Sequence, residues 1–481
     1  MTANKLPAPK ALAAALTAAL ALLAGTPGGA HAAVTITINN INAAGVGFND
    51  TTAAAPIGGN TGTTVGQQRL QAFTYAANIW GSTLTSAVPI VINAQFSALT
   101  CTATSAVLGS AGATSVYRDF PNAPKAATWY SYALANKISG VYLGAANAAQ
   151  INANFNVNLG QPTCLANTYF YLGLDNNHGS NVDFVTVLLH EMGHGIGFQT
   201  FTNGATGAFF SSAPSVWDHY LLDNTNNVLW KDMTAAQRKA SSLKANGLSW
   251  TGARVTAAVP AVLSHTSQLV ISGAPAGAAA GTYVVGDASF GPPLATPALL
   301  GQLMPVVDQA DGSGLACTAL SAANATAVKN NIALISRGSC AFAIKVKNAQ
   351  NAGAIGVLIA DNVTAVVSGL SGDDATITIP AVRISLADAT TLKATLARRS
   401  RTSSGVVASM GQSATLRAGA DSLGRITMYT PNPYESGSSV SHFTTAATRN
   451  QLMEPAINGD LTHAPILPYD LTFELLKDIG W

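Results

Sequence analysis

The chain has 481 residues, of which 48% are apolar and only 10% are charged, and its formal net charge is +2. This length exceeds what a single hydrophobic core usually carries, so we expect two domains. No basic patch stands out in the sequence, and nucleic acid is therefore not an expected partner.

The first 32 residues have the features of a secretory signal. Lys5 and Lys10 form a short basic start, Ala11–Gly25 is an apolar run, and Ala30–Ala32 is a small-x-small cleavage site. The apolar run is shorter than the roughly 20 residues that usually span a bilayer. We therefore expect residues 1–32 to be a signal peptide and the mature chain to be secreted without a membrane anchor. Release to the medium and retention in the periplasm both stay open.

Apolar patterns predict the elements of the first half of the chain. Alternation indicates strands, and apolar positions three or four apart indicate helices. The expected strands cover residues 34–38, 90–96 and 169–172, and the expected helices cover residues 67–84 and 126–137.

The four cysteines of an exported chain suggest two disulfides, for which three pairings are possible. Proximity along the chain favours Cys101–Cys164 and Cys317–Cys340, one in each expected domain. No Cys-x-x-Cys is present, so we do not expect a thiolate zinc site.

The stretch from Val187 to Phe198 contains His-Glu-x-x-His. Residues four apart lie on one face of a helix, so His190 and His194 can direct two imidazoles at one Zn²⁺. Glu191 lies beside the first ligand and is expected to act as general base toward a water at the metal. The spacing therefore predicts a catalytic zinc site on a helix.

The residues around this motif support a buried helix. The run 184–189 is apolar, Ser180 or Asn181 is the expected N-cap, and Asp183 is expected in the first turn. Gly197 is the expected stop. Strands followed by a late metal-binding helix are typical of an α+β fold.

The second half of the chain has a different texture, rich in Ala, Gly, Val and Ile. A strand, a helix and a fully apolar strand follow one another there, which predicts a β-α-β unit with parallel strands. The expected strands cover residues 331–338, 354–360 and 379–385; the expected helices cover 341–352, 386–398 and a final stretch from about 470; residues 274–281 are an expected loop.

A catalytic zinc usually has three protein ligands and one open position. The commonest extension of the motif places a third His six residues after the second, but Thr200 is there. Asp218 is a carboxylate alternative for the third ligand. His442 is the favoured candidate, because Met453 follows it eleven residues later and could form an apolar floor beneath three histidines.

Two distant pieces together resemble the leishmanolysin-type metzincins. The first is His-Glu-x-x-His-x-x-Gly-Phe, at His190–Phe198. The second comprises Ser441–Phe443, Leu452–Pro455, Leu471-Thr472 and the terminal Asp478–Trp481. The resemblance implies a metzincin-like catalytic domain with a mixed sheet, an active-site helix and a Met-turn.

This resemblance also implies roles for individual residues. His190, His194 and His442 would be the ligands of a single catalytic Zn²⁺. Glu191 would be the general base, and Met453 would be the Met-turn residue.

The middle of the chain resembles a protease-associated (PA) domain at residues 332–342, 345–354 and 379–382. Such domains are non-catalytic modules, and here one would fill the interval between the second and third ligands. The expected division is therefore a signal peptide at 1–32, catalytic-domain parts at 33–264 and 416–481, and an inserted α/β PA domain at 265–415.

These features predict a secreted zinc endopeptidase that acts on protein or peptide substrates. We expect the substrate to lie extended along an edge strand. One alternative is a secreted binding or adhesion protein that uses the PA domain and a structural zinc, although a structural site has no need of Glu191. Another alternative is a zinc exopeptidase.

Overall fold

The computed structural model describes residues 33–307, 314–365 and 367–481, so the expected signal peptide lies outside the described residues. The chain forms two compact units. The first contains the chain up to Ala258 together with 427–445 and 450–481, and the second contains 259–426 and 446–449. The second unit thus extends beyond the expected 265–415 at both ends, and residues 446–449 also belong to it. There the Ser264 amide donates to the Thr448 carbonyl.

The first unit is built on a four-stranded sheet of order β1-β2-β8-β5. The strands β1 (Ile36–Asn40), β2 (Ile90–Ser97) and β8 (Ile151–Asn156) are parallel, and β5 (Gly109–Ala113) is antiparallel at the edge. Buried and half-buried residues alternate along β2, as expected for a strand with one face on a core.

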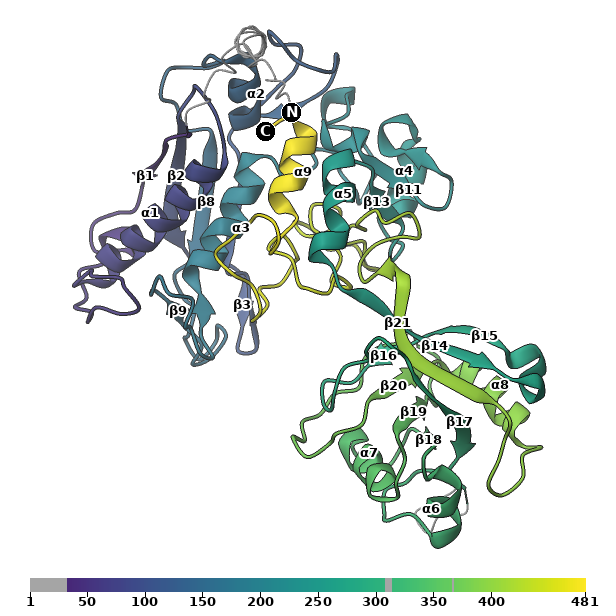
Figure 1. Ribbon diagram of the computed structural model, residues 1–481. Coiled ribbons are helices and arrows are strands. Elements are labelled where there is room, and N and C mark those ends of the chain that lie inside the picture. The colour runs from purple at the N-terminus through teal and green to yellow at the C-terminus, as the bar shows by residue number, and fades with distance from the viewer. Residues whose placement is uncertain (1–32, 308–313, 366) are drawn as a thin grey trace, which may run out of the picture. The chain divides into compact units, whose positions relative to one another are not determined.

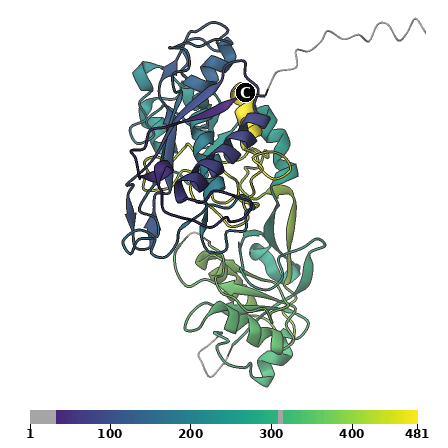
Figure 2. The same ribbon diagram turned by 90° about the vertical axis from the view of Figure 1, so that its left-hand side faces the viewer.

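Two helices pack against each other and against this sheet: α1 (Val65–Thr83) and α3 (Phe184–Ile196) (Figure 1). Figure 2 views the unit from the side on which β1 and α1 lie. The fully buried Trp80 of α1 donates from its indole Nε1 to the Leu189 carbonyl of α3, 3.0 Å away. This bond fixes the two helices to each other beside the first histidine of the motif.

Shorter elements complete the first unit and its margins. The helices are α2 (Tyr132–Ser139), α4 (Ala235–Ser241), α5 (Ala253–Val262) and α9 (Thr472–Ile479). The short strands are β3 (Cys101–Thr102), β4 (Ser105–Ala106), β6 (Val116–Tyr117), β7 (Tyr130–Ser131), β9 (Phe170–Tyr171), β10 (Val182–Asp183), β11 (Leu221–Asp223), β12 (Val228–Leu229) and β13 (Leu248–Trp250).

The helix expected over 126–137 is wrong in its first half. Ala127 has a left-handed φ of 49°, and the strand β7 pairs with β6 before α2 begins at Tyr132. A residue in the left-handed conformation cannot continue a right-handed helix, so the chain forms a turn at Ala127 and α2 begins only at Tyr132.

The second unit contains an eight-stranded mixed sheet of order β15-β14-β21-β17-β18-β19-β20-β16. The predicted β-α-β unit is confirmed: β18 and β19 are parallel, and α7 (Phe342–Asn351) connects them. The strands are β14 (His265–Ser272), β15 (Gly281–Val284), β16 (Gly286–Asp287), β17 (Leu299–Pro305), β18 (Ile332–Ser336), β19 (Gly356–Ala360), β20 (Ala381–Ile384) and β21 (Val407–Arg417).

Both faces of this sheet are buried, which explains the continuous apolar runs of its central strands. Leu334 and Leu358 belong to a core that includes residues of α8 (Leu386–Leu396). The alternate residues Ala333 and Val357 belong to a second core, which includes residues of α6 (Ala322–Val328) and α7.

Each unit carries one disulfide, and the two are the pairs that proximity along the chain favours. Cys101 is joined to Cys164 in the first unit and Cys317 to Cys340 in the second. Among the described residues, no helix combines the length and the apolar character needed to cross a membrane.

Candidate metal centre

The helix α3 begins at a different cap from the expected one. Asp183, rather than Ser180 or Asn181, is the N-cap, and its Oδ1 accepts from the Thr186 amide at 2.6 Å. The same oxygen lies 2.9 Å from Nε2 of His463. This arrangement attaches the start of the helix to a segment near the end of the chain, which no local sequence pattern indicates.

The end of α3 is also anchored. Gly197 follows the helix with a φ of 144°, so the expected stop is where the helix ends. The Ile196 carbonyl accepts from the Ser131 hydroxyl and from the Trp481 indole, each at 3.1 Å. Both ends of the helix are therefore fixed by residues far away in the sequence.

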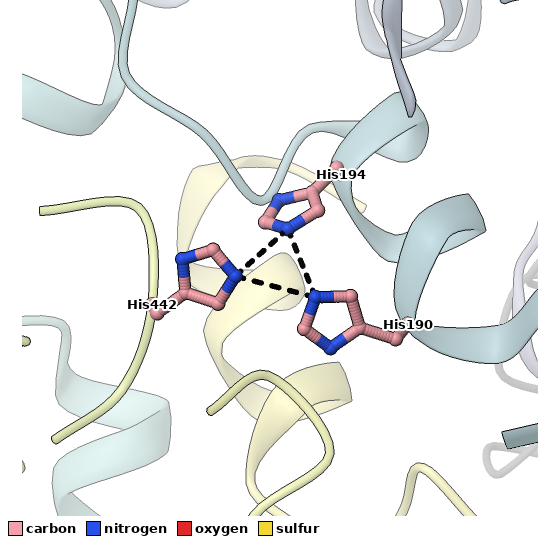
Figure 3. Close-up of side chains that lie close together, drawn as sticks. All are labelled: His190, His194 and His442. Atoms are coloured by element: carbon pink, nitrogen blue, oxygen red, sulfur yellow. Dashed lines mark hydrogen bonds between the residues drawn. The ribbon is translucent and has the colours of Figure 1, made fainter. Parts of the chain in front are cut away.

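The histidines 190, 194 and 442 direct their Nε2 atoms at one another (Figure 3). The separations are 3.2 Å between 190 and 194, 3.1 Å between 194 and 442, and 3.2 Å between 190 and 442. The first two come from α3, whereas the third comes from a loop 248 residues after the second (Figure 3). Within the described residues this is the group of side chains suited to hold a metal ion.

Hydrogen bonds at the other ring nitrogens define the tautomer of each histidine. His190 Nδ1 lies 2.7 Å from the Leu452 carbonyl, His194 Nδ1 lies 2.8 Å from the Phe198 carbonyl, and His442 Nδ1 lies 2.7 Å from the Ser438 carbonyl. A carbonyl oxygen only accepts, so each Nδ1 carries the proton and donates. Each neutral ring then presents a lone pair at Nε2.

Burial keeps these rings neutral. It lowers the pKa of His190 to about 4, against the opposing effect of the bond to Leu452. Burial and then the neighbouring His190 lower the pKa of His194 to about 3. Burial and the two other rings hold the pKa of His442 well below its ordinary value.

Three lone pairs that converge without a proton between them fit a cation. Three nitrogens at about 2.1 Å from a tetrahedral Zn²⁺ would lie roughly 3.4 Å apart, close to the observed separations. Backbone carbonyls at the opposite nitrogens are the usual partners of metal-ligating histidines. The donor set therefore suits Zn²⁺ with one position left for a water or a substrate oxygen.

Glu191 is buried next to the first histidine, and its carboxyl accepts from the Ala111 amide of β5. Burial raises the pKa of Glu191 to about 8, and the bond from Ala111 acts in the opposite direction. A cation close by would favour the charged carboxylate.

Met453 is fully buried beneath α3. A Cβ added at Gly193 would lie 2.8 Å from its Sδ, so the glycine between the two helix histidines leaves the space that the methionine fills. The Met453 carbonyl accepts from the Phe443 amide at 2.8 Å, which joins this turn to the loop of His442. Met453 thus lies against α3 at Gly193, next to His194 in the chain.

The structure does not bring Asp218 to the histidines. Its fully buried carboxylate accepts from the hydroxyls of Thr200, Thr202 and Ser215 and from the Ser215 amide, at 2.6–2.9 Å. These bonds occupy both oxygens. Asp218 therefore stabilises the segment that follows α3 and is not placed to bind a metal at the histidines.

A cavity of about 970 Å³ surrounds the metal-site residues. Its walls come from residues 105–111, which lead into β5, from 178–183, from 434–442 and from 454–459. All four segments belong to the first unit. The strand β5 is not among the elements expected from the sequence, because Gly-Ser-Ala-Gly-Ala lacks the apolar alternation that indicates a strand.

Comparison with known proteins identifies one part of the chain. The PA domain family model matches residues 301–392, which lie in the second unit and inside the expected range 265–415. The predicted PA domain is therefore confirmed, as is a mixed α and β fold that contains it. No curated protein matches the sequence.

Solved structures resemble the chain only in part. An aminopeptidase from Aneurinibacillus sp. strain AM-1 is 24% identical with a TM-score of 0.23, over 32% of this chain and 31% of that one. The zinc aminopeptidase BSAP from Bacillus subtilis is 22% identical with a TM-score of 0.22, over 37% and 38% of the two chains. The subtilisin-like protease Apa1 from Pseudoalteromonas sp. AS-11 is 17% identical with a TM-score of 0.23, over 32% and 35%. The chain thus spans about a third of the length of these proteins, and such partial similarity does not identify its function.

Proposed function

We propose that the first unit is a secreted zinc endopeptidase of the metzincin type, and that the PA domain is inserted between its second and third ligands. One observation carries the proposal: three neutral imidazoles converge on a point in a cavity, with the carboxyl of Glu191 beside them. Met453 beneath the site and the two disulfides agree with this reading, since disulfides persist in oxidising compartments.

His190, His194 and His442 would hold the zinc. When bound, the ion would act as a Lewis acid toward the scissile carbonyl and would lower the pKa of water. Glu191 would accept the proton of the attacking water and deliver it to the leaving amine. Both proton transfers would use the same carboxylate, which is the reason for its place beside the ligands.

The open edge of β5, at Gly109 and Ala111, would bind the substrate backbone. Hydrogen bonds on either side of the strand show which residues face β8. The Asn156 amide donates to the Leu108 carbonyl and the Thr114 amide donates to the Gln150 carbonyl, each at 2.9 Å. Bonded and non-bonded residues alternate in an antiparallel pair, so the peptide groups of Gly109 and Ala111 point to the open edge. An extended peptide can add there as a further strand.

Digestion of casein with and without a chelator tests the proposal, and Glu191→Gln is the decisive variant. We expect chelation to stop hydrolysis, and the variant to lose ~10²- to 10⁴-fold in rate while it keeps its zinc. A rate that stays at the wild-type level after either change would refute the assignment. Mass analysis of the products separates internal cleavage from trimming at the ends, which would indicate the exopeptidase alternative. Zinc binding without any hydrolysis would favour the binding protein.

A further inference from the structure

The strand β5 passes the Glu191 side chain at van der Waals distance. A Cβ added at Gly109 would lie 3.0 Å from both Cγ and Oε1 of Glu191 and 3.1 Å from Cδ. Contacts this short are tighter than side chains normally make, so either the strand or the carboxyl would have to move. Even the Cβ of an alanine at position 109 would therefore displace the Glu191 side chain or the strand by a few tenths of an ångström.

The conformation of Gly109 does not itself require glycine. Its φ lies outside the left-handed region in which L-residues are strained, unlike the φ of Gly197. Space beside Glu191 is thus the property that glycine provides at this position, and alanine there would test the contact alone.

Two residues further along the strand, the Ala111 amide donates to the Glu191 carboxyl. This amide points to the open edge of the sheet and is not used in the pairing of β5 with β8. A glutamate side chain has three rotatable bonds, and the neighbouring backbone of Gly109 together with the Ala111 amide limits the positions that its carboxyl can adopt.

We propose that Gly109 and Ala111 are positioning residues that hold the Glu191 carboxylate in the orientation needed for proton transfer; we call this pair the Glu191 clamp. The inference rests on the proposed peptidase function. It implies that one residue serves two purposes, because Ala111 would bind the base through its amide and the substrate backbone through its carbonyl.

Gly109→Ala is the direct test, and Gly112→Ala is its matched control. Gly112 lies on the same strand, its φ is also outside the left-handed region, and a Cβ there would make an ordinary 3.6 Å contact with Gln199 Oε1. We expect Gly109→Ala to keep one zinc per chain and a KM within about twofold of the wild type, and to lose ~10- to 100-fold in kcat, since small misplacements of reacting groups cost this much. The control should stay within about twofold in both constants.

A second variant keeps the inference testable if Gly109→Ala does not fold. Ala111→Pro removes the amide that reaches Glu191, and proline is tolerated where the missing N–H faces a sheet edge. We expect the same loss in kcat with zinc retained.

The outcomes separate this inference from the proposed function. A wild-type protein without chelator-sensitive hydrolysis would overturn the peptidase proposal. An active wild type together with a Gly109→Ala or Ala111→Pro variant of unchanged kcat would overturn the clamp alone. Loss of zinc from either variant would also overturn it, because the residues would then support the metal site and not the orientation of the base.

Discussion

Each ligand histidine has its proton fixed on the nitrogen that faces away from the site. The carbonyls of Leu452, Phe198 and Ser438 belong to three different segments, and each accepts from one Nδ1. Three lone pairs at 3.1–3.2 Å repel one another unless a proton or a cation lies between them. Burial lowers the pKa of each ring, which disfavours a proton there, so the three lone pairs are suited to a cation.

The same burial makes a prediction for the metal-free protein. The pKa of His190 is about 4 and that of His194 about 3 when folded, against about 6.5 when unfolded. Between these values the unfolded chain binds more protons than the folded chain, so the free energy of unfolding must fall as the pH falls from about 7 to 5. We expect a loss of about 2 kcal/mol per imidazole at pH 5.

Urea unfolding of metal-free protein at pH 7 and pH 5 measures this loss. In the variant His194→Asn, the free energy of unfolding should fall less between pH 7 and pH 5, by the contribution of one imidazole. Equal stability of the wild type at both pH values would show that the histidines are not buried as neutral rings.

At the scale of elements, α3 is held by residues that are distant from it in the sequence of the first unit. Trp80 of α1 bonds its middle, His463 contacts its N-cap, and Trp481 bonds its last carbonyl. His190 and His194, two of the three proposed ligands, therefore lie on a helix whose rotation and translation are both restrained. Such restraint is what a metal site with three ligands on two segments needs.

The fit of Met453 beneath α3 yields a prediction about Gly193. Gly193→Ala would place a Cβ 2.8 Å from the Met453 Sδ, and overpacking of this kind typically costs about 1–3 kcal/mol. Gly459→Ala is the control, because a Cβ at that position has no atom within 4 Å. Urea denaturation of the two variants gives the comparison, and the prediction fails if they are equally stable.

The sequence predicted some elements of the site better than others, for physical reasons. The four-residue spacing of His190 and His194 defines a helix face by itself, so local geometry was sufficient. The choice of His442 over Asp218 depended on the position of Met453 and on the resemblance to metzincins, since a ligand from a distant loop has no local signal. The N-cap was placed too early because several nearby side chains can accept, and the pairing of β10 with β9 decides that Asp183 does so.

Edge strand β5 shows what pattern reasoning misses. Its small residues permit close approach to Glu191 but give neither apolar alternation nor β propensity. In the second unit the apolar runs of β18 and β19 are buried on both faces, so their strands and the connecting helix were predictable. The proposed substrate-binding strand is therefore the element with the weakest sequence signal.

At the scale of the whole molecule, two units with separate cores and one disulfide each predict separable unfolding. Cys317 and Cys340 are 23 residues apart, and a loop of this size is worth roughly 3 kcal/mol of stability. Replacing both cysteines by serine should lower the midpoint temperature of one calorimetric transition and leave the zinc content per chain unchanged. A single transition, or loss of zinc in this variant, would contradict the division into units.

The central claim is that a histidine near the end of the chain completes a metal site begun on α3. Zinc content per chain, measured on the wild type and on His442→Ala after dialysis against a mild chelator, tests it most directly. The account predicts one zinc ion in the wild type and little or none in the variant, with Asp218→Asn retaining its zinc. Full zinc retention in His442→Ala, or a wild-type protein that binds no zinc at all, would contradict it.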